Sequence, residues 1–429
     1  MSYLRAAILG LGLIVSGCAP ALDGSGSIVL TPAEVEAGGL AGAISLHDSI
    51  AVYDSHLDTP ALFHSEAYTF SKRGSWEVDG THVDLPRMNE GGLDGGFWVI
   101  FTRQGPLDTQ SYAAARTHAL MRQTAIREFA AKYEDEVALA FSAEDADRIL
   151  AAGKKVVFQS MENSYPLGTD LSLLDHFYIG GLRMIAPVHF ANNQFADSAT
   201  DISAVHDGLS QLGETLIVRA NDLGLILDGS HASDATVRDM LALSRTPIIL
   251  SHTGAKAIYD HPRNIDDALL QELADQGGVI QMNIFGGYLE ALEPSPERTA
   301  ALAELEATYG TDTSTMSPER LAAWNTARRA LDRSYPRPRS TYEKFMEHTF
   351  YVLELIGPEH VGISGDWDGG GGVDGMSDVS MLQKITEDLL RAGYSQSEVE
   401  MIWGGNMMRL MAAAEAGRTS QLVSPNILN

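Results

Sequence analysis

The sequence predicts an α/β protein folded as a (β/α)8 TIM barrel, and three observations carry that prediction. Eight short apolar runs recur along the chain, amphipathic helical patterns separate them, and a polar side chain often ends a run. Strands that alternate with helices form parallel βαβ units. Eight such units close a barrel, in which the carboxyl ends of the strands meet at one mouth.

The eight predicted strands are short segments rich in β-branched and aromatic residues, which favour β-structure. In chain order they span residues 51–58, 95–101, 154–162, 181–189, 224–231, 246–252, 277–285 and 359–368. Helices are predicted over 113–133, 200–223 and 234–243, where apolar residues recur at spacings of three and four and so share one face.

Composition excludes several classes of protein. The 429 residues are 45% hydrophobic, which rules out wholesale disorder. Fifty-seven acidic against thirty basic residues give a net charge of −27, which would repel a phosphate backbone, so no nucleic-acid partner is expected. The one cysteine, Cys18, excludes an intramolecular disulfide, a four-cysteine zinc site and an iron–sulfur cluster. Any metal site must therefore use His, Asp and Glu.

The N-terminus is typical of an exported bacterial protein. Arg5 precedes an apolar run from Ala6 to Val15, which is too short to span a bilayer and predicts a signal peptide over residues 1–17. The sequence Val15-Ser16-Gly17-Cys18 resembles a lipobox, which implies lipidation of Cys18 and anchoring to a membrane. The alternative is an ordinary secretory signal with a chance cysteine.

The rest of the N-terminus also fits an exported, membrane-anchored protein. Residues 18–45 are predicted to form a small, polar tether between the lipid and the domain. Ala19, directly after the cysteine, resembles the sorting signal for the outer membrane. The expected location is therefore the bacterial cell envelope, with the protein lipid-anchored at the outer membrane and facing the periplasm.

The chain length permits one enlarged barrel or two domains, and the strand pattern favours one barrel over residues 46–415. Residues 289–341 are charged, Ala-rich and bounded by Pro-rich edges, which predicts a helical insertion in a barrel loop. Such an insertion could act as a lid. Residues 416–429 form a C-terminal tail.

Potential ligands end the predicted strands. They are His56, Asp58, Glu162, His189, His231, His252 and Asp366. A single histidine at such a position is more often a hydrogen-bonded residue at the edge of the core, but recurrence at successive strand ends favours a shared site. His56 and Asp58 lie two apart on one strand, so both can face one ion. Imidazoles without cysteines suit Zn, Mn, Ni or Co, and Glu162 is the natural candidate to bridge two ions.

Ordered motifs across most of the chain resemble the membrane dipeptidase family. They are DSHLD (54–58), DLPRMNEGGLDGGFW (84–98), MENSYPLG (161–168), GLRMIAPVHFANNQFADS (181–198), LILDGSHAS (225–233), SRTPIILSHTGAKAIYDHPRN (244–264), HVGISGDWDG (360–369) and WGGNMMRL (403–410). The resemblance implies a barrel of the metal-dependent amidohydrolase type that holds two Zn²⁺ per chain and hydrolyses dipeptides.

The resemblance also implies a role for each residue. His56 and Asp58 would ligate one zinc, His231 and His252 the other, and Glu162 would bridge them. The remaining matches are His189, which contacts substrate and stabilises the developing oxyanion, Arg263, which holds the terminal carboxylate, Tyr288, near the substrate, and Asp366, which transfers the proton.

The implied substrates are dipeptides with a free C-terminal carboxylate, extending to a D-residue at the C-terminal position, and a homodimer is implied by resemblance only. Two segments depart from the family pattern, 162–165 and 228–231, and both bear on pocket shape. The alternatives left open are another metal-dependent amidohydrolase, acting on an acyl-amino acid, a lactam or a β-lactam, and a non-catalytic peptide-binding lipoprotein.

Overall fold

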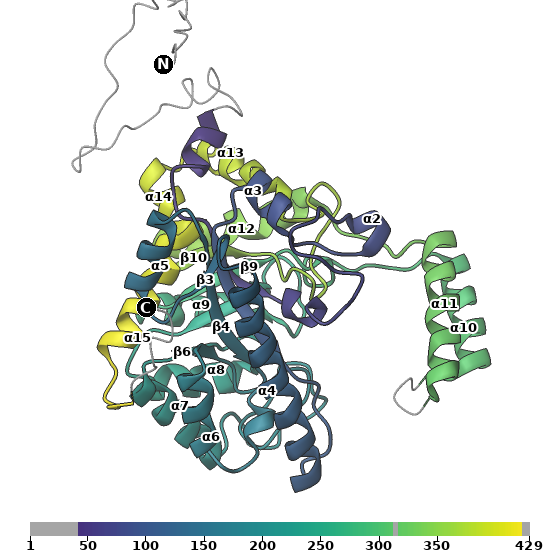
Figure 1. The fold of residues 1–429 in the computed structure, drawn as a ribbon, viewed down its shortest axis with the longest axis horizontal. Helices are drawn as coiled ribbons and strands as arrows, with labels where there is room; N and C mark the ends of the chain where they lie inside the picture. Colours follow the sequence, from purple (N-terminus) through teal and green to yellow (C-terminus); the bar gives the residue numbers. More distant parts are fainter. Residues whose placement is uncertain (1–41, 312–315, 423–429) are drawn as a thin grey trace, which may run out of the picture.

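Eight parallel strands follow one another around the molecule in chain order in the computed structural model, which describes residues 42–311 and 316–422 (Figure 1). They are β1 (Tyr53–Leu57), β2 (Gly95–Phe101), β4 (Lys155–Glu162), β5 (Leu182–Ile185), β6 (Ile226–Leu227), β7 (Ile249–Ala255), β9 (Val279–Asn283) and β10 (Val361–Ser364). Seven of them lie within a predicted run, and β7 continues three residues beyond the run predicted over 246–252.

Two backbone bridges join the strands into a closed barrel. The ladders run β1-β2-β4-β5-β6 in one sheet and β10-β9-β7 in the other. Asp228, directly after β6, pairs in parallel with Ile249 of β7, and Leu57 of β1 pairs in parallel with Trp367, just beyond β10. The amide of Asp58 donates to the carbonyl of Trp367 at 2.9 Å. The barrel therefore closes between β10 and β1, which confirms the predicted fold class.

Two short strands lie outside this cycle. β3 (Val137–Leu139) pairs with the first residues of β4, and β8 (Asn264–Ile265) pairs with the end of β7. Both are too short to show a periodic pattern in the sequence.

Helices pack around the barrel. They are α2 (Trp76–Asp79), α3 (Leu85–Gly91), α4 (Thr109–Lys132), α5 (Ala143–Ala151), α6 (Ser172–Ile179), α7 (Gln211–Leu223), α8 (Asp234–Leu243), α9 (Asp267–Asp275), α12 (Tyr342–Ile356), α13 (Gln383–Arg391), α14 (Gln396–Glu400) and α15 (Asn406–Ala416). Side chains cap the first turn of many of these; Ser233, for example, accepts from the amide of Thr236 at the start of α8. The structure thus has the helix predicted over 234–243 and, in α4, most of the one over 113–133.

The helix predicted over 200–223 is wrong in its first half. Residues 200–208 instead wrap around Asp197, whose carboxylate accepts the amides of Val205, His206 and Gly208 at 2.9 to 3.2 Å. These local hydrogen bonds satisfy backbone donors that a helix would otherwise use. α7 begins only at Gln211, after the cap Ser210.

An apolar cluster closes one end of the barrel. It takes side chains from seven strands, and these are Tyr53, Phe97, Val156, Phe158, Met184, Ile226, Ile249 and Val279. Met407, Leu410 and Met411 of α15 pack in the same cluster. This end of the barrel is filled by core side chains, so the polar strand ends meet at the opposite mouth.

The segment 289–341 contains two helices, α10 (Pro296–Tyr309) and α11 (Pro318–Ser334), which form a hairpin that stands off the barrel (Figure 1). Over the ranges described, no helix is long and apolar enough to cross a membrane. The predicted signal peptide, Cys18 and most of the tether lie outside the described residues, as do residues 423–429 of the tail.

Candidate metal centre

Five potential ligands converge at the open mouth of the barrel. His56 lies on β1 with Asp58 just beyond it, Glu162 ends β4, His231 follows β6 and His252 lies on β7. His56, Glu162, His231 and His252 are all at most 5% exposed. Polar side chains are buried this deeply only where they have partners or hold a cation.

Glu162 lies between two groups of these ligands. Its Oε2 lies 3.6 Å from Nε2 of His56, and His56 Nε2 lies 3.4 Å from Oδ2 of Asp58. Its Oε1 faces the other way, 3.0 Å from Nε2 of His231 and 3.6 Å from Nε2 of His252. One carboxylate therefore presents a separate oxygen to each group, as a bridging ligand does.

Hydrogen bonds orient His252 for metal binding. The Ser251 hydroxyl donates to Asp228 Oδ2 at 2.6 Å, so at 2.8 Å it accepts from Nδ1–H of His252. This arrangement leaves the lone pair of His252 Nε2 directed into the site, where a metal would take it. The Nδ1 atom of His231 is buried without a hydrogen-bond partner.

Burial and neighbouring charges set the protonation states. Burial lowers the pKa of both His231 and His252 well below the usual range, which keeps them as neutral imidazoles, the form that binds metal. Burial alone would raise the pKa of Glu162, but His189 and His56 outweigh it and hold that pKa well below its usual range. His56 differs, because Glu162 and Asp58 raise its pKa well above the usual range despite its burial. The site thus presents two neutral imidazoles, those of His231 and His252, beside an ionised carboxylate.

The backbone is in the left-handed region at four residues of this mouth. Asn163, His231, Asp366 and Asp368 have φ of 70°, 68°, 51° and 65°. Residues other than glycine seldom adopt this conformation, and such outliers cluster at functional sites. Each of these residues lies one to four positions after the end of a strand, and the sequence pattern did not predict their conformation.

Asp366 follows β10 and lies beside the first group of ligands. An oxygen of Asp366 and ligand atoms of His56 and Asp58 all lie within 4.8 Å of one another. Asn283 Nδ2 donates to Asp366 Oδ2 at 3.4 Å. Burial raises the pKa of Asp366 to about 6, with His56 acting in the opposite direction.

A cavity of about 430 Å³ opens above these groups. His189 lines it, with Nε2 3.7 Å from Oε1 of Glu162 and its ring edge-on to Phe101 at 4.9 Å. Phe190, Phe285 and Tyr288 supply further walls. The cavity therefore combines an apolar wall with polar groups gathered at one end, which is the usual make-up of a small-molecule site.

Arg263 lies behind Tyr288 and is not part of the cavity lining. Its guanidinium is 5.0 Å from the Tyr288 ring centre, and Nη2 donates to the carbonyl of His252 at 3.1 Å. The residue is 3% exposed, its Nε has no partner, and no acidic side chain among the described residues forms an ion pair with it. A buried guanidinium without an acid suits an anionic ligand.

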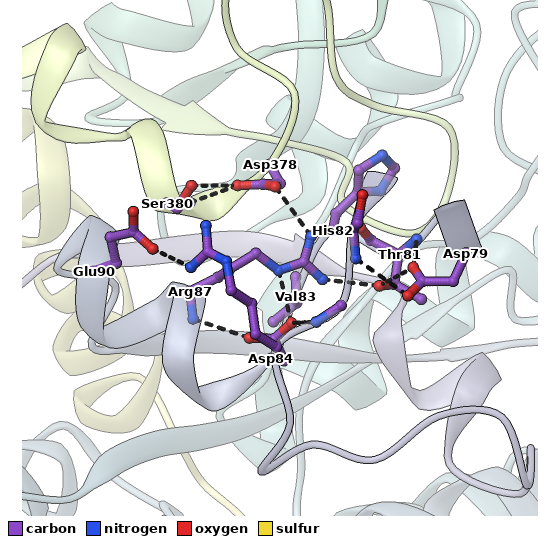
Figure 2. Close-up of polar contacts among 12 residues, drawn as sticks. Asp79, Thr81, His82, Val83, Asp84, Arg87, Glu90, Asp378 and Ser380 are labelled. Carbon is purple, nitrogen blue, oxygen red and sulfur yellow. Dashed lines mark hydrogen bonds and ion pairs between the residues drawn. The ribbon is translucent and has the colours of Figure 1, made fainter. Parts of the chain in front are cut away.

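A buried network supports the Asp366 loop from outside. Asp368 Oδ2 accepts from Thr59 at 2.7 Å, and its Oδ1 accepts the amide of His82, also at 2.7 Å. Figure 2 shows Arg87 nearby, where its Nε contacts Asp84 at 2.7 Å and its Nη1 contacts Asp378 at 3.0 Å. The sequence pattern assigned no role to Asp84, Arg87 or Asp378, although residues 84–87 belong to the motif DLPRMNEGGLDGGFW. The signal that could have found them is an arginine close to an aspartate in that motif.

A closed (β/α)8 barrel whose mouth gathers buried histidines around a shared carboxylate defines the class of metal-dependent hydrolases. The family described as membrane dipeptidase, peptidase family M19, matches residues 40–424. The chain therefore belongs to this family and is a metallopeptidase.

Named relatives agree with this assignment. Dipeptidase tcpJ of Claviceps purpurea is 29% identical over 346 residues, which cover 79% of this chain and 71% of that protein. Dipeptidase 3 of Rattus norvegicus is 26% identical over 394 residues, covering 89% and 68% of the two chains.

Solved structures share the fold. The probable dipeptidase PvdM of Pseudomonas aeruginosa superposes with a TM-score of 0.75 at 31% identity, covering 90% of this chain and 100% of that one. A metallo peptidase of Rhodobacter sphaeroides, liganded with a phosphinate mimic of L-Ala-D-Ala, has a TM-score of 0.67 at 22% identity, covering 85% and 99%.

Proposed function

We propose that this protein is a binuclear zinc dipeptidase that hydrolyses dipeptides with a free C-terminal carboxylate. The observation that carries the proposal is the position of Glu162, which turns one oxygen toward His56 and the other toward His231 and His252. Three imidazoles and two carboxylates without a thiolate suit Zn²⁺.

The ligand set fits two ions. His56 and Asp58 would hold one, His231 and His252 the other, and Glu162 both. When bound, the two ions supply Lewis acidity for the peptide carbonyl and activate water. The neutral state of His231 and His252 supports this assignment, because only the unprotonated nitrogen binds metal.

Two side chains at the cavity would carry the remaining chemistry. Asp366, buried and with a pKa of about 6, is suited to take a proton near neutral pH and return it to the leaving amine. His189 lines the cavity beside Glu162 and would donate to the carbonyl oxygen as negative charge develops on it.

Arg263 and Tyr288 would hold the substrate's terminal carboxylate. The unpaired Nε of Arg263 supports this role, since a fork of guanidinium donors matches a carboxylate. Because the guanidinium lies behind Tyr288, that ring would have to shift for direct contact. A D-residue at the C-terminal position is included in the proposal, supported by the L-Ala-D-Ala mimic bound to the Rhodobacter sphaeroides protein.

The proposed location is the periplasmic face of the outer membrane, with a lipid on Cys18, and a homodimer is the proposed assembly. The basis for the location is the N-terminal sequence. Cys18→Ser should abolish lipidation and leave the signal peptide uncleaved, so that the unprocessed precursor accumulates; a variant that is still processed and membrane-bound would refute the anchor.

Zinc analysis combined with a substrate panel tests the function. We expect two Zn²⁺ per chain and hydrolysis of L-Ala-L-Ala and L-Ala-D-Ala, with loss of both activities on chelation. C-terminally amidated dipeptides should be poor substrates. Faster turnover of an N-acyl-amino acid, a lactam or a β-lactam would favour another amidohydrolase activity, and a metal-free chain that binds dipeptides without cleaving them would favour a binding protein.

A further inference from the structure

Arg122 of α4 lies at the wall of the cavity and carries a charge that the proposed chemistry does not use. It lines the cavity with Ala61, Val99 and Phe101. Its Nη1 donates to the backbone carbonyl of Pro60. Within the described residues, no carboxylate lies within ion-pair distance of this guanidinium, so its remaining donors are available to a ligand.

Arg122 and the proposed carboxylate site face each other across the barrel. In the closed order of strands, β2 is second and β7 is sixth of eight, so the two lie on opposite sides. α4 follows β2, and Arg263 follows β7. A dipeptide whose terminal carboxylate lies toward Arg263 and Tyr288 therefore directs its N-terminal residue toward the wall that contains Arg122.

Arg122 is the one Lys or Arg side chain among the described residues that line the cavity. Four carboxylates line the cavity, from Asp58, Glu162, Asp366 and Asp368. Two divalent ions would offset four negative charges. A ligand would then meet Arg122 as the uncompensated charge, on a wall formed by Val99 and Phe101, where limited access of water strengthens an ion pair.

Arg122 is half-buried, and among the described residues its guanidinium contacts the carbonyl of Pro60 but no carboxylate. Burial lowers the pKa of Arg122, and Asp58 is the charge that offsets part of this effect. Arg127, half-buried on the same helix, is not among the residues that line this cavity. A guanidinium held at the wall of a substrate cavity with free donors is the usual arrangement for binding a carboxylate.

We infer that Arg122 selects dipeptides whose N-terminal residue is acidic, by pairing with the Asp or Glu side chain. This inference rests on the proposed dipeptidase function and specifies its substrate class. It assigns Arg122 to specificity and leaves the bond-breaking step to the groups named above.

Paired substrates of equal size test the inference. The full chain, loaded with zinc, is assayed on L-Glu-L-Ala against L-Gln-L-Ala, and on L-Ala-L-Glu against L-Ala-L-Gln. We expect kcat/KM to favour Glu-Ala over Gln-Ala by about 10-fold or more, and to differ by less than about 3-fold in the reversed pair. An equal preference in both pairs would refute an N-terminal specificity site.

Variants then link the preference to the residue. Arg122→Gln should abolish the preference for Glu-Ala, with a much smaller effect on Gln-Ala, and Arg122→Lys should retain part of it. Arg127→Gln, on the same helix but away from the cavity, is the matched control and should behave as wild type. Zinc content is measured for each variant.

Four outcomes would overturn the inference. Arg122→Gln could lower kcat/KM equally on all four dipeptides, or it could lower zinc content. Either result would show that Arg122 positions Asp58 and does not bind the substrate. Hydrolysis of Gln-Ala without any preference for Glu-Ala would refute the inference alone. No hydrolysis of any dipeptide by the zinc-loaded protein would refute the proposed function and the inference together.

Discussion

Nε2 of His231, in the loop after β6, lies 2.8 Å from Nε2 of His252 on the neighbouring strand β7, and both residues are buried. Nδ1 of His252 carries the proton shared with Ser251, so its Nε2 has a lone pair directed at His231. With Glu162 Oε1 3.0 Å from His231, three atoms that can each ligate a metal lie next to one another. A cation between them would relieve this contact.

The first prediction follows from that arrangement. Removing metal with a chelator should lower the melting temperature, because an ion that binds only the folded chain stabilises it by about 3 kcal/mol at 100 times its Kd. Calorimetry before and after chelation, followed by restoration with Zn²⁺, measures this. His252→Ala should bind less zinc and show a smaller change on chelation. An unchanged melting temperature in wild type would argue against a structural contribution from the ions.

Asp366→Asn provides a second prediction. The amide keeps the shape of the side chain and its contact with Asn283 but cannot accept the proton, so turnover should fall about 100- to 10,000-fold. Zinc content should stay at the wild-type value. Asp374→Asn, at an acid whose side chain is 66% exposed, is the control and should retain activity. Full activity of Asp366→Asn would remove Asp366 from proton transfer.

The strands, and the convergence of the polar residues that end them, were predictable because both depend on local pattern. Each of the eight apolar runs overlaps a strand, and the polar residues that end the runs converge at one mouth because parallel strands direct their carboxyl ends to the same side. What the sequence could not provide is how Glu162 divides its oxygens between the two groups.

Specific polar contacts, local at Asp197 and long-range at Arg87, account for most of the features that sequence reasoning missed. Residues 200–208 have a helical pattern, but the carboxylate of Asp197 takes their amides. Arg87 joins Asp84 to Asp378, which lies 291 residues away in the chain. Such pairings depend on the closed barrel, and no periodic pattern of residues reports them.

The hairpin of α10 and α11 should be dispensable for folding and catalysis. No other described element makes comparable contacts with either helix, and no cavity-lining residue comes from them, so the hairpin is not a lid in this structure. Its base is closed by Ser340, which donates to Glu290 at 2.6 Å.

Replacing residues 294–337 with a short Gly/Ser linker tests this. The melting temperature should change by less than about 4 °C, because about 1 kcal/mol shifts a domain of roughly 150–250 residues by about 2 to 4 °C and a larger one by less. Activity on dipeptides should stay within a factor of about three. A loss above tenfold would show that the hairpin contributes to the site.

Arg87 should be among the most sensitive positions outside the metal centre. Its guanidinium is fully buried between Asp84, Asp378 and Thr81 (Figure 2). Arg87→Met would leave two carboxylates without their cation, and breaking a buried pair in this way costs about 3 to 5 kcal/mol. The measurement is the free energy of unfolding in urea.

A surface pair supplies the control for Arg87. Arg391, whose side chain is 59% exposed, contacts Glu387 on α13, and Arg391→Met should change the free energy of unfolding by less than about 1 kcal/mol. Adding Asp84→Asn and Asp378→Asn to Arg87→Met should recover part of the loss, since the unpaired charges are removed. Equal, small effects of Arg87→Met and Arg391→Met would contradict the assigned importance of the network.

His47 predicts a pH dependence of stability that is separate from the metal centre. Trp403 Nε1 donates to Thr386 Oγ1 at 2.7 Å, and that hydroxyl lies 2.7 Å from His47 Nδ1, while His47 Nε2 donates to the carbonyl of Gly91 at 2.9 Å. The network fits a neutral imidazole, and burial lowers the pKa of His47 from 6.5 to about 4.

The sign follows from where the proton binds. Above pH 6.5 neither the folded nor the unfolded chain holds a proton on His47, so its environment has no effect on stability there. Between pH 6.5 and about 4 the unfolded chain binds the proton and the folded chain does not. The free energy of unfolding therefore decreases by up to about 3 kcal/mol as the pH is lowered over this range. The free energy of unfolding is measured from pH 4 to 8 for wild type and His47→Gln, both without metal. The difference between the two curves cancels the other titrating groups, and it should change steadily below pH 6.5 and be constant above it. A difference that is constant over the whole range would show that His47 titrates alike in the folded and unfolded chains.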